Sequence, residues 1–271
     1  MRQLLLTLFW MGKASAVLVW VSGGPVWLGV FLFCAPGLVV VYHLFMPGTE
    51  GLGPVQTRFA TSRREVWLTI DDGPDESDTP RNLELLARYN AKATFFVIGE
   101  RAERHPELIQ AVVLAGHEIG HHTYSHPAKS LWCASRARLK RELDLGLAAL
   151  ARCGVRPRWF RAPVGIKHVW LEPELQRRGL EHVGWTIRSW DSVEADPAVV
   201  ARRVRERVRP GSIVLLHEGA RLQPEVRMGA LEAVLQVLRE EGYTCILPHA
   251  ASPEAAVWTA PAVETEVRVA G

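Results

Sequence analysis

The chain has 271 residues, of which 48% are hydrophobic and 23% charged, a composition typical of folded globular protein and not of disorder. Its 32 basic and 29 acidic residues give a net charge of +3, and no Lys/Arg block is interleaved with aromatic residues. This balance argues against a nucleic-acid partner. Nothing in the composition indicates an obligate protein partner.

The N-terminal 46 residues form an apolar segment distinct from the rest. No charged residue occurs from Ala14 to Tyr42, and Gly23-Gly24-Pro25 divides the stretch because Pro and paired Gly interrupt a helix. Val26–Phe45 is long enough to span a bilayer. Leu4–Ser22 is a weaker candidate, since Lys13 lies near its middle, where a charge is unfavourable.

Several arrangements of this segment fit the sequence. A single span at 26–45 would leave Arg2 inside and the C-terminal domain outside, on the periplasmic or cell-surface side. A two-span hairpin would put both ends on one side. A signal cleaved near Ala14-Ser15-Ala16 and a buried core helix are the other readings. We expect attachment to a membrane through the N-terminus, with the domain outside the cytoplasm.

Composition also divides the remainder of the chain. Residues 47–64, which include the Gly-rich stretch Gly48–Pro54, are expected to be a linker. Residues 65–250 are expected to fold as one domain, and 251–271 to be a disordered tail. Cys34 is expected to be buried in the apolar stretch. A disulfide among Cys133, Cys153 and Cys245 stays open.

Short apolar runs alternate with amphipathic segments through the folded domain. The predicted strands are Glu65–Ile70, Ala93–Ile98, Glu118–His121, Trp159–Arg161, His182–Ile187, Ile213–Leu216 and Tyr243–Leu247. The predicted helices are Pro80–Tyr89, Pro106–Ala115, Arg136–Ala151, Glu172–Arg178, Pro197–Arg209 and Val226–Glu240. Apolar strands alternating with helices predict a parallel sheet covered on both faces, and about seven units fit a closed or nearly closed (β/α) barrel.

Polar clusters follow the predicted strands at the ends where such a barrel places its functional residues. They are Asp71-Asp72, His122 and His126, Arg161, Asp191, and His217. The carboxyl ends of parallel strands lie on one face, so these clusters, distant in sequence, are expected to converge. Each taken alone equally fits a structural or solvated residue.

Two of these clusters have the chemistry of a metal site. One carboxylate of Asp71-Asp72 can ligate a metal while its neighbour acts as a base, and Gly73-Pro74 turns the chain directly afterwards. His122 and His126 are four residues apart, so one helical turn would present both imidazoles on one side. Two His and one carboxylate suit Zn²⁺ or a similar first-row ion.

The His-rich stretch leaves the identity of the ligands open. His117 and His121 lie in the same segment as His122 and His126, and either could be the true partner.

The other clusters supply groups for positioning and proton transfer. Arg161, at a strand end, would orient a neighbouring carboxylate. His217 ends a buried strand and suits a general acid that protonates a leaving amine. Asp191 could pair with that imidazole and raise its pKa.

Together, the motifs resemble those of the NodB-homology polysaccharide deacetylases, carbohydrate esterase family 4. The resemblance covers roughly Val66 to Pro248 and includes T-I-D-D-G-P from Thr69, H-T-Y-S-H from His122, R-A-P-V-G from Arg161 and I-V-L-L-H from Ile213. It implies a distorted (β/α)7 barrel, in the α/β class, preceded here by an N-terminal transmembrane segment.

The resemblance also implies roles for individual residues. Asp71 would be the catalytic base oriented by Arg161, and His217 the general acid tuned by Asp191. Asp72, His122 and His126 would bind one divalent ion, Zn²⁺ in preference to Co²⁺ or Mn²⁺. The backbone N–H of Val164 would hold the oxyanion, and Pro163 and Trp190 would line the substrate pocket.

The sequence departs from the family pattern around the substrate pocket. His121 stands where Asn is common, Val164 where an aromatic residue is common, and Glu218 where Asp is common. The fourth motif, commonly D-x-x-D-W, has Arg188, Asp191 and Ser192 here, so Trp185 or Trp190 must supply its apolar wall.

The expected reaction is metal-dependent hydrolysis of the N-acyl amide, N-acetyl above all, of an amino sugar in a polysaccharide or cell-envelope glycan. The alternatives are a deacylase or deformylase of a lipid-linked sugar and a non-catalytic glycan-binding homologue.

Overall fold

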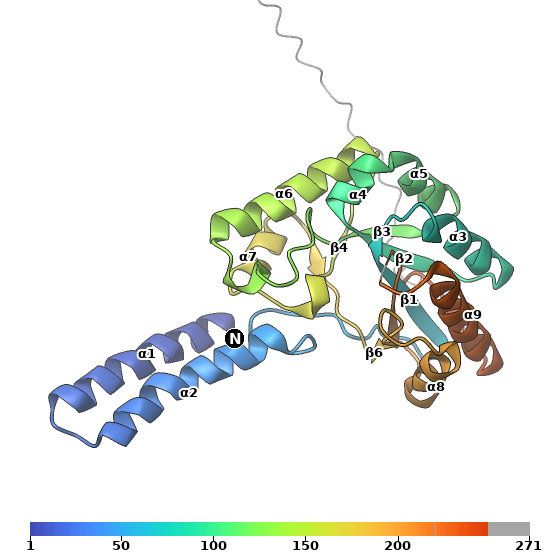
Figure 1. Ribbon diagram of the computed structural model, residues 1–271. Helices are drawn as coiled ribbons and strands as arrows, with labels where there is room; N and C mark the ends of the chain where they lie inside the picture. The colour runs from blue at the N-terminus through green and yellow to red at the C-terminus, as the bar shows by residue number, and fades with distance from the viewer. Residues whose placement is uncertain (220, 249–271) are drawn as a thin grey trace, which may run out of the picture.

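The computed structural model describes residues 1–219 and 221–248, so the whole tail expected at 251–271 lies outside the described residues. Two long N-terminal helices pair as a hairpin that projects from a barrel of strands surrounded by helices (Figure 1). The hairpin and the first strand are connected by residues 46–64. Leu52 packs against the end of the second helix, whereas Val55 and Phe59 pack against the barrel.

Every strand pair in the sheet is parallel, in the order β5-β4-β3-β2-β1-β7-β6, and β8 also pairs with β1. The strands are β1 (Glu65–Gly73), β2 (Ala93–Val97), β3 (Glu118–His121), β4 (Trp159–Phe160), β5 (Glu181–His182), β6 (Ile187–Arg188), β7 (Ile213–His217) and β8 (Thr244–Cys245). Among the described residues no ladder joins β5 to β6, so the barrel is open there. The predicted distorted (β/α) barrel is confirmed.

Helices cover the outside of the barrel. They are α3 (Asp78–Arg88), α4 (Gly99–Arg104), α5 (Pro106–Leu114), α6 (Arg136–Arg152), α7 (Leu171–Gln176), α8 (Pro197–Arg207) and α9 (Pro224–Glu240), with short 3₁₀ turns at Leu131–Cys133 and Pro163–Gly165. Local chemistry sets several starts. Ser135 and Asp196 cap α6 and α8 with side-chain oxygens that accept from backbone N–H groups.

Side-chain alternation along β1 explains where the chemistry lies. Val66, Leu68 and Ile70 pack outward into the main core beneath the helices. Trp67, Thr69 and Asp71 therefore point into the barrel, because successive side chains of a strand face opposite sides. The same alternation on β7 turns His217 inward, and His217 is the register partner of Asp71.

Three expectations about local structure need correction. The predicted strand His182–Ile187 is two short strands, β5 and β6. Helix α4 was not predicted, because six residues are too few for an apolar period to show. Cys34 is exposed rather than buried, since α2 packs mainly against α1 and leaves its other sides open, and all four cysteines are free thiols.

The hairpin consists of α1 (Arg2–Val21) and α2 (Val26–Phe45), each 20 residues long. Both are long and apolar enough to cross a bilayer, and most of their apolar side chains are exposed. Gly12 and Gly29 permit close approach, because a Cβ at either would meet Leu32 or Trp20 at under 3.0 Å. The ammonium of Lys13 lies 3.5 Å from the centre of the Phe33 ring.

Candidate active site

Asp71 is held at the inner rim of the barrel by a fully buried arginine. Arg161 follows β4, and its Nη1 donates to Asp71 Oδ1 (2.7 Å) and to Thr69 Oγ1 (2.8 Å). Nη2 donates to the carbonyl of Gly184 at 2.7 Å, and Nε to that of Val183 at 3.3 Å. Both ends of the guanidinium are therefore fixed, and one oxygen of Asp71 is committed to Arg161, while Oδ2 faces the neighbouring histidines.

Asp72, His122 and His126 form a compact cluster beside Asp71. Asp72 Oδ1 lies 3.4 Å from His122 Nε2 and 3.2 Å from His126 Nε2. One possible ligand atom from each residue lies within 4.8 Å of the others. His122 Nε2 also lies 3.8 Å from Asp71 Oδ2. The structure thus brings together the three residues expected to bind the ion.

The cluster fits a divalent cation on two observations. Ligand atoms about 2.0–2.2 Å from a tetrahedral Zn²⁺ lie about 3.3–3.6 Å apart, and Asp72 Oδ1 lies 3.4 and 3.2 Å from the two imidazoles, within about 0.1 Å of that range. Asp72 Oδ1 is also buried without a hydrogen-bond donor among the described residues. A buried carboxylate oxygen with no donor is unfavourable unless a cation satisfies it.

The protonation of the cluster agrees with a ligand role. Burial acts to raise the pKa of Asp72, but the neighbouring imidazoles of His122 and His126 hold that pKa well below its usual range. Burial lowers the pKa of His126 to about 4, so its imidazole is neutral near pH 7. His122 Nδ1 donates to the carbonyl of Arg161 at 2.8 Å, which leaves Nε2 as the acceptor facing Asp72.

His122 and His126 are brought together by a backbone conformation that their sequence spacing did not predict. Residues 122–126 form an irregular turn, not a helical one, with positive φ at Thr123 (65°) and His126 (52°). The expectation of a shared helical face was wrong. The turn is held from outside by Glu142 of α6, which accepts from the backbone N–H groups of Tyr124 and Ser125 at 3.2 and 2.9 Å.

The neighbouring histidines have structural roles. His121 is fully buried, its Nε2 donates to the carbonyl of Leu143 at 3.0 Å, and its Nδ1 accepts from the Thr123 N–H at 2.9 Å. His117 Nδ1 accepts from the Ala93 N–H at 3.2 Å. Both rings are engaged away from Asp72, which favours His122 and His126 over His117 and His121 as the candidate ligands.

His217, at the end of β7, is paired with a buried carboxylate. Its Nδ1 donates to Asp191 Oδ1 (2.9 Å), and its backbone N–H donates to Asp191 Oδ2 (2.7 Å). Ser189 Oγ also donates to Asp191 Oδ1, at 2.6 Å. Burial acts to lower the pKa of His217, but Asp191, aided by Asp72 and Asp71, raises it to about 9. His217 is therefore a charged donor at neutral pH.

The wall of the site contains exposed apolar groups and strained backbone. Val164 is 43% and Trp190 41% exposed, whereas Pro163 is buried. Val164 has φ 51° and Trp190 has φ 65°. A β-branched residue is strained at positive φ, and such strain concentrates at functional sites. The Arg188 guanidinium lies 3.9 Å from the Trp190 ring centre.

Sequence reasoning missed two positioning residues. Glu142 holds the turn of the ligand histidines, and Arg101 Nη1 donates to the backbone carbonyl of Asp72 at 2.7 Å. Both lie on helices, Glu142 at a buried position and Arg101 at a half-buried one, and neither belongs to a motif. Glu218, noted as a departure from the family, is buried next to Gly73, and burial raises its pKa to about 8.

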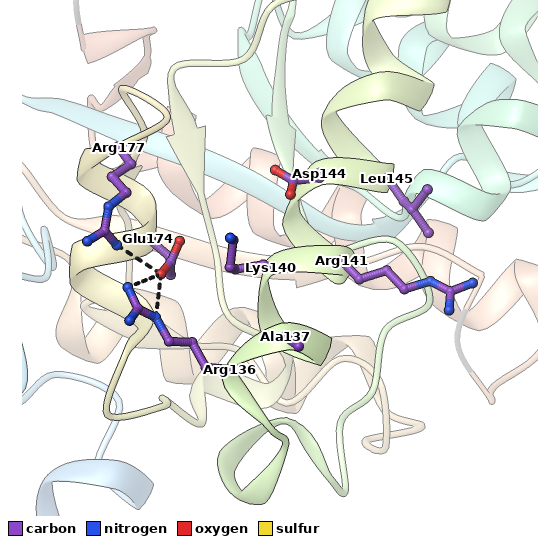
Figure 2. Close-up of a pocket in the computed structure, with 8 residues that line it drawn as sticks. All are labelled: Arg136, Ala137, Lys140, Arg141, Asp144, Leu145, Glu174 and Arg177. Carbon is purple, nitrogen blue, oxygen red and sulfur yellow. Dashed lines mark hydrogen bonds and ion pairs between the residues drawn. The ribbon is translucent and has the colours of Figure 1, made fainter.

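A separate surface cavity of about 790 Å³ lies between α6 and α7, away from this cluster. Arg136 and Arg177 converge there on Glu174, while Lys140 and Arg141 extend from α6 (Figure 2). Its two acids, Glu174 and Asp144, are paired with arginines, so among the described residues it offers no free carboxylate.

Comparison with known proteins agrees with the geometry. The polysaccharide deacetylase family model matches residues 59–200. The chain belongs to the polysaccharide deacetylase family. A peptidoglycan-N-acetylglucosamine deacetylase of Bacillus cereus is 33% identical over 198 residues, 72% of this chain and 91% of that protein. A chitooligosaccharide deacetylase of Sinorhizobium fredii is 40% identical over 168 residues, 60% of this chain and 75% of that one.

Solved structures give the same result. The Bc1960 peptidoglycan N-acetylglucosamine deacetylase superposes with a TM-score of 0.65 at 30% identity, covering 72% of this chain and 91% of that one. The resemblance to carbohydrate esterase family 4 is confirmed, and with it the prediction that this deacetylase is a hydrolase.

Proposed function

We propose that this deacetylase is a metal-dependent hydrolase that removes the N-acetyl group from an amino sugar of a glycan. The observation that supports it best is the placement of Asp71 and His217, as register partners, beside the Asp72–His122–His126 cluster. Zn²⁺ is the proposed ion, because two imidazoles and one carboxylate at these separations suit it; Co²⁺ and Mn²⁺ are alternatives.

The chain's own groups account for the proton transfers. A divalent ion in the cluster would polarise the acyl carbonyl and make water a stronger acid. Asp71 Oδ2 accepts the proton of the attacking water, because Oδ1 is occupied by Arg161. His217 gives its Nε2 proton to the departing amine, since Nδ1 is held by Asp191. The C–N bond breaks, and acetate and the free amine leave.

The pocket wall supplies the remaining roles. The backbone N–H of Val164 is the proposed donor to the oxyanion, supported by the strained φ that fixes its direction. Pro163 and Trp190 are proposed to bound the sugar. N-acetylglucosamine is the proposed sugar, because relatives named as peptidoglycan and chitooligosaccharide deacetylases match over most of the domain.

Removal of one ligand tests the metal assignment. His126→Ala is expected to lose the ion on dialysis, with affinity reduced about 10²-fold or more, because only two ligands remain. Metal content is measured by plasma mass spectrometry, and acetate release from an N-acetylglucosamine oligomer falls to background. The control is His105→Ala, which removes an imidazole paired with Glu76 and Glu107. It is expected to keep both the bound metal and the acetate release. Full metal content in His126→Ala would contradict the assignment.

We propose that residues 1–46 anchor the protein in a membrane as a two-span hairpin, followed by a catalytic domain at 65–250. Arg2 Nη1 donates to the carbonyl of Val169 in that domain at 3.2 Å, so both ends of the hairpin lie on one side. The expectation of an external domain rested on a single span with Arg2 inside. In a hairpin Arg2 accompanies the domain, and the side of the membrane stays a prediction.

Reporter fusions test this topology. Alkaline phosphatase fused to the N-terminus or to the C-terminus is expected to give the same result in both cases, and to be active if the domain is external. The control is a chain truncated to begin at Val26, which leaves one span and frees the N-terminus to lie opposite the domain. Opposite results for the two full-length fusions would exclude the hairpin.

A further inference from the structure

The hairpin docks on the catalytic face of the barrel. The loop after β3, which carries His122 and His126, also carries Trp132, whose ring centre lies 5.5 Å from that of Phe45 at the end of α2. The loop after β4, which carries Val164, continues to Val169, which packs against the end of α2. The loops that build the site therefore also hold the membrane helices.

A buried lysine fixes this docking. The backbone N–H of Lys167 donates to the carbonyl of Leu44 at 2.9 Å. Its Nζ donates to the carbonyls of Met46 (2.8 Å) and Thr49 (2.5 Å) and to Thr49 Oγ1 (2.9 Å). These are the first residues after α2. The chain thus leaves the hairpin directly onto the catalytic domain.

Because the hairpin is docked on the domain, the active site cannot move far from the end of α2. A flexible tether of n residues would let a domain explore about 5–6 Å × √n, but residues 46–49 are bound and Leu52 and Val55 are buried. The active site therefore stays at the surface from which α2 emerges. A substrate has to come to that surface.

The same side of the domain has the composition of a membrane-facing surface. Trp132 and Trp170 are 39% and 36% exposed. The Trp170 ring is contacted by Arg2, the first residue of α1, and by Arg136 of α6, which borders the basic cavity of Figure 2. Amphipathic aromatic rings and basic side chains are typical of the interface with anionic headgroups.

An arginine at the pocket wall forms no salt bridge with the described residues, although the charge of Asp191 acts on it. Arg188 of β6 lies between the rings of Trp185 (6.0 Å) and Trp190 (3.9 Å). Its Nε is buried without a hydrogen-bond partner among the described residues. A guanidinium stacked on aromatic rings and free to donate matches a phosphate or carboxylate.

This arginine lies close to the exit of the hairpin. A Cβ built at Gly165 would come within 2.7 Å of Pro47, directly after α2, and within 2.5 Å of Trp185. Pro47 and Trp185 therefore pack on the same glycine, and Trp185 borders Arg188. An anionic group bound by Arg188 would therefore lie on the side of the site that faces the end of α2.

We propose that the substrate is an N-acetylated amino sugar joined through phosphate to a membrane lipid, with Arg188 binding the phosphate. This rests on the proposed deacetylase function and narrows its substrate class. The lipid tail stays in the bilayer, the phosphate lies at headgroup level against Arg188, and the sugar enters the site.

The test uses the full chain in lipid nanodiscs with the divalent ion added. Three probes are compared: a polyprenyl-pyrophosphoryl N-acetylglucosamine, a neutral alkyl glycoside of N-acetylglucosamine in the same nanodiscs, and a soluble N-acetylglucosamine oligomer. The phosphate-linked lipid is expected to exceed the soluble oligomer in kcat/KM by about 10²-fold or more, because enzyme and substrate share one surface. The neutral glycolipid is expected to fall between them.

Arg188→Gln tests the phosphate contact. It is expected to raise KM for the phosphate-linked lipid about tenfold and to abolish its advantage over the neutral glycolipid, while Arg188→Lys restores part of it. Arg239→Gln is the matched control, because Arg239 also stacks on an aromatic ring, Tyr89, but lies on α9. Equal turnover of soluble and lipid-linked probes, or an unchanged advantage in Arg188→Gln, overturns the proposal. Absence of acetate release from every probe overturns the deacetylase function itself.

Discussion

Asp71→Asn is expected to lower kcat by about 10²–10⁴-fold while leaving the metal bound. An amide cannot take a proton from water at neutral pH, so the attacking water loses its base. The Asn oxygen can still accept from Arg161 Nη1, and Asp72, His122 and His126 are untouched, so the fold and the metal site are expected to persist. KM should change little, because the loss falls on the transition state.

Three measurements distinguish this from a structural defect. Metal content, thermal unfolding and kcat are compared for the wild type, Asp71→Asn and Asp196→Asn. Asp196 caps α8 with its side-chain oxygen, a role that Asn fills equally well, so it controls for the chemical change alone. Wild-type kcat in Asp71→Asn would show that another group is the base. Loss of the metal would mean that Asp71 is a ligand.

The barrel could be predicted because its strands are buried on both faces and its helices are amphipathic. The apolar runs at β1, β2, β3 and β7 each lie within three residues of where the sequence placed them. Parallel pairing then forces strand ends together, which is why Asp71 and His217, 146 residues apart, could be expected at one rim. Side-chain alternation along β1 then points Asp71 into the barrel.

The conformation of the turn that carries His122 and His126 could not be derived from their spacing. His122 and His126 meet because Thr123 and His126 adopt positive φ, and no local pattern of residues encodes that conformation. It depends on Glu142, contributed by a helix that follows in the chain, whose carboxylate accepts from Tyr124 and Ser125. A tertiary hydrogen bond of this kind is invisible to periodicity.

The docking of the hairpin on the domain is a second feature that could not be predicted from the sequence. Hydropathy identified two apolar segments but not their partner, because the exit of α2 is fixed by Lys167, a single residue more than a hundred positions later. Nothing in the Gly-rich stretch after α2 indicates that the segment is bound. Docking of the hairpin on the barrel rim therefore follows from tertiary contacts that no local sequence pattern indicates.

Asp191→Asn is expected to move the alkaline limit of activity from about pH 9 toward 6.5, the pKa of an unperturbed imidazole. In the wild type Asp191 is the main group that raises the pKa of His217, and Asp72 and Asp71 add to it. His217 must be protonated to act as the acid, so activity is lost as the pH rises through its pKa. Near pH 7.5 the protonated fraction should fall about tenfold.

The pH–rate profile of kcat separates this tuning from a loss of structure, because a merely destabilised variant would lose amplitude without moving its midpoint. Asp144→Asn, which removes an exposed carboxylate paired with Arg178, is the control and keeps the wild-type profile. The free energy of unfolding is expected to depend on pH in the same direction as the activity. A raised imidazole pKa stabilises the fold fully below about pH 6.5 and loses that stabilisation as the pH passes about 9, so the gap in unfolding free energy between wild type and Asp191→Asn should narrow at alkaline pH. An unshifted midpoint in Asp191→Asn would mean that His217 is not the acid that limits the reaction.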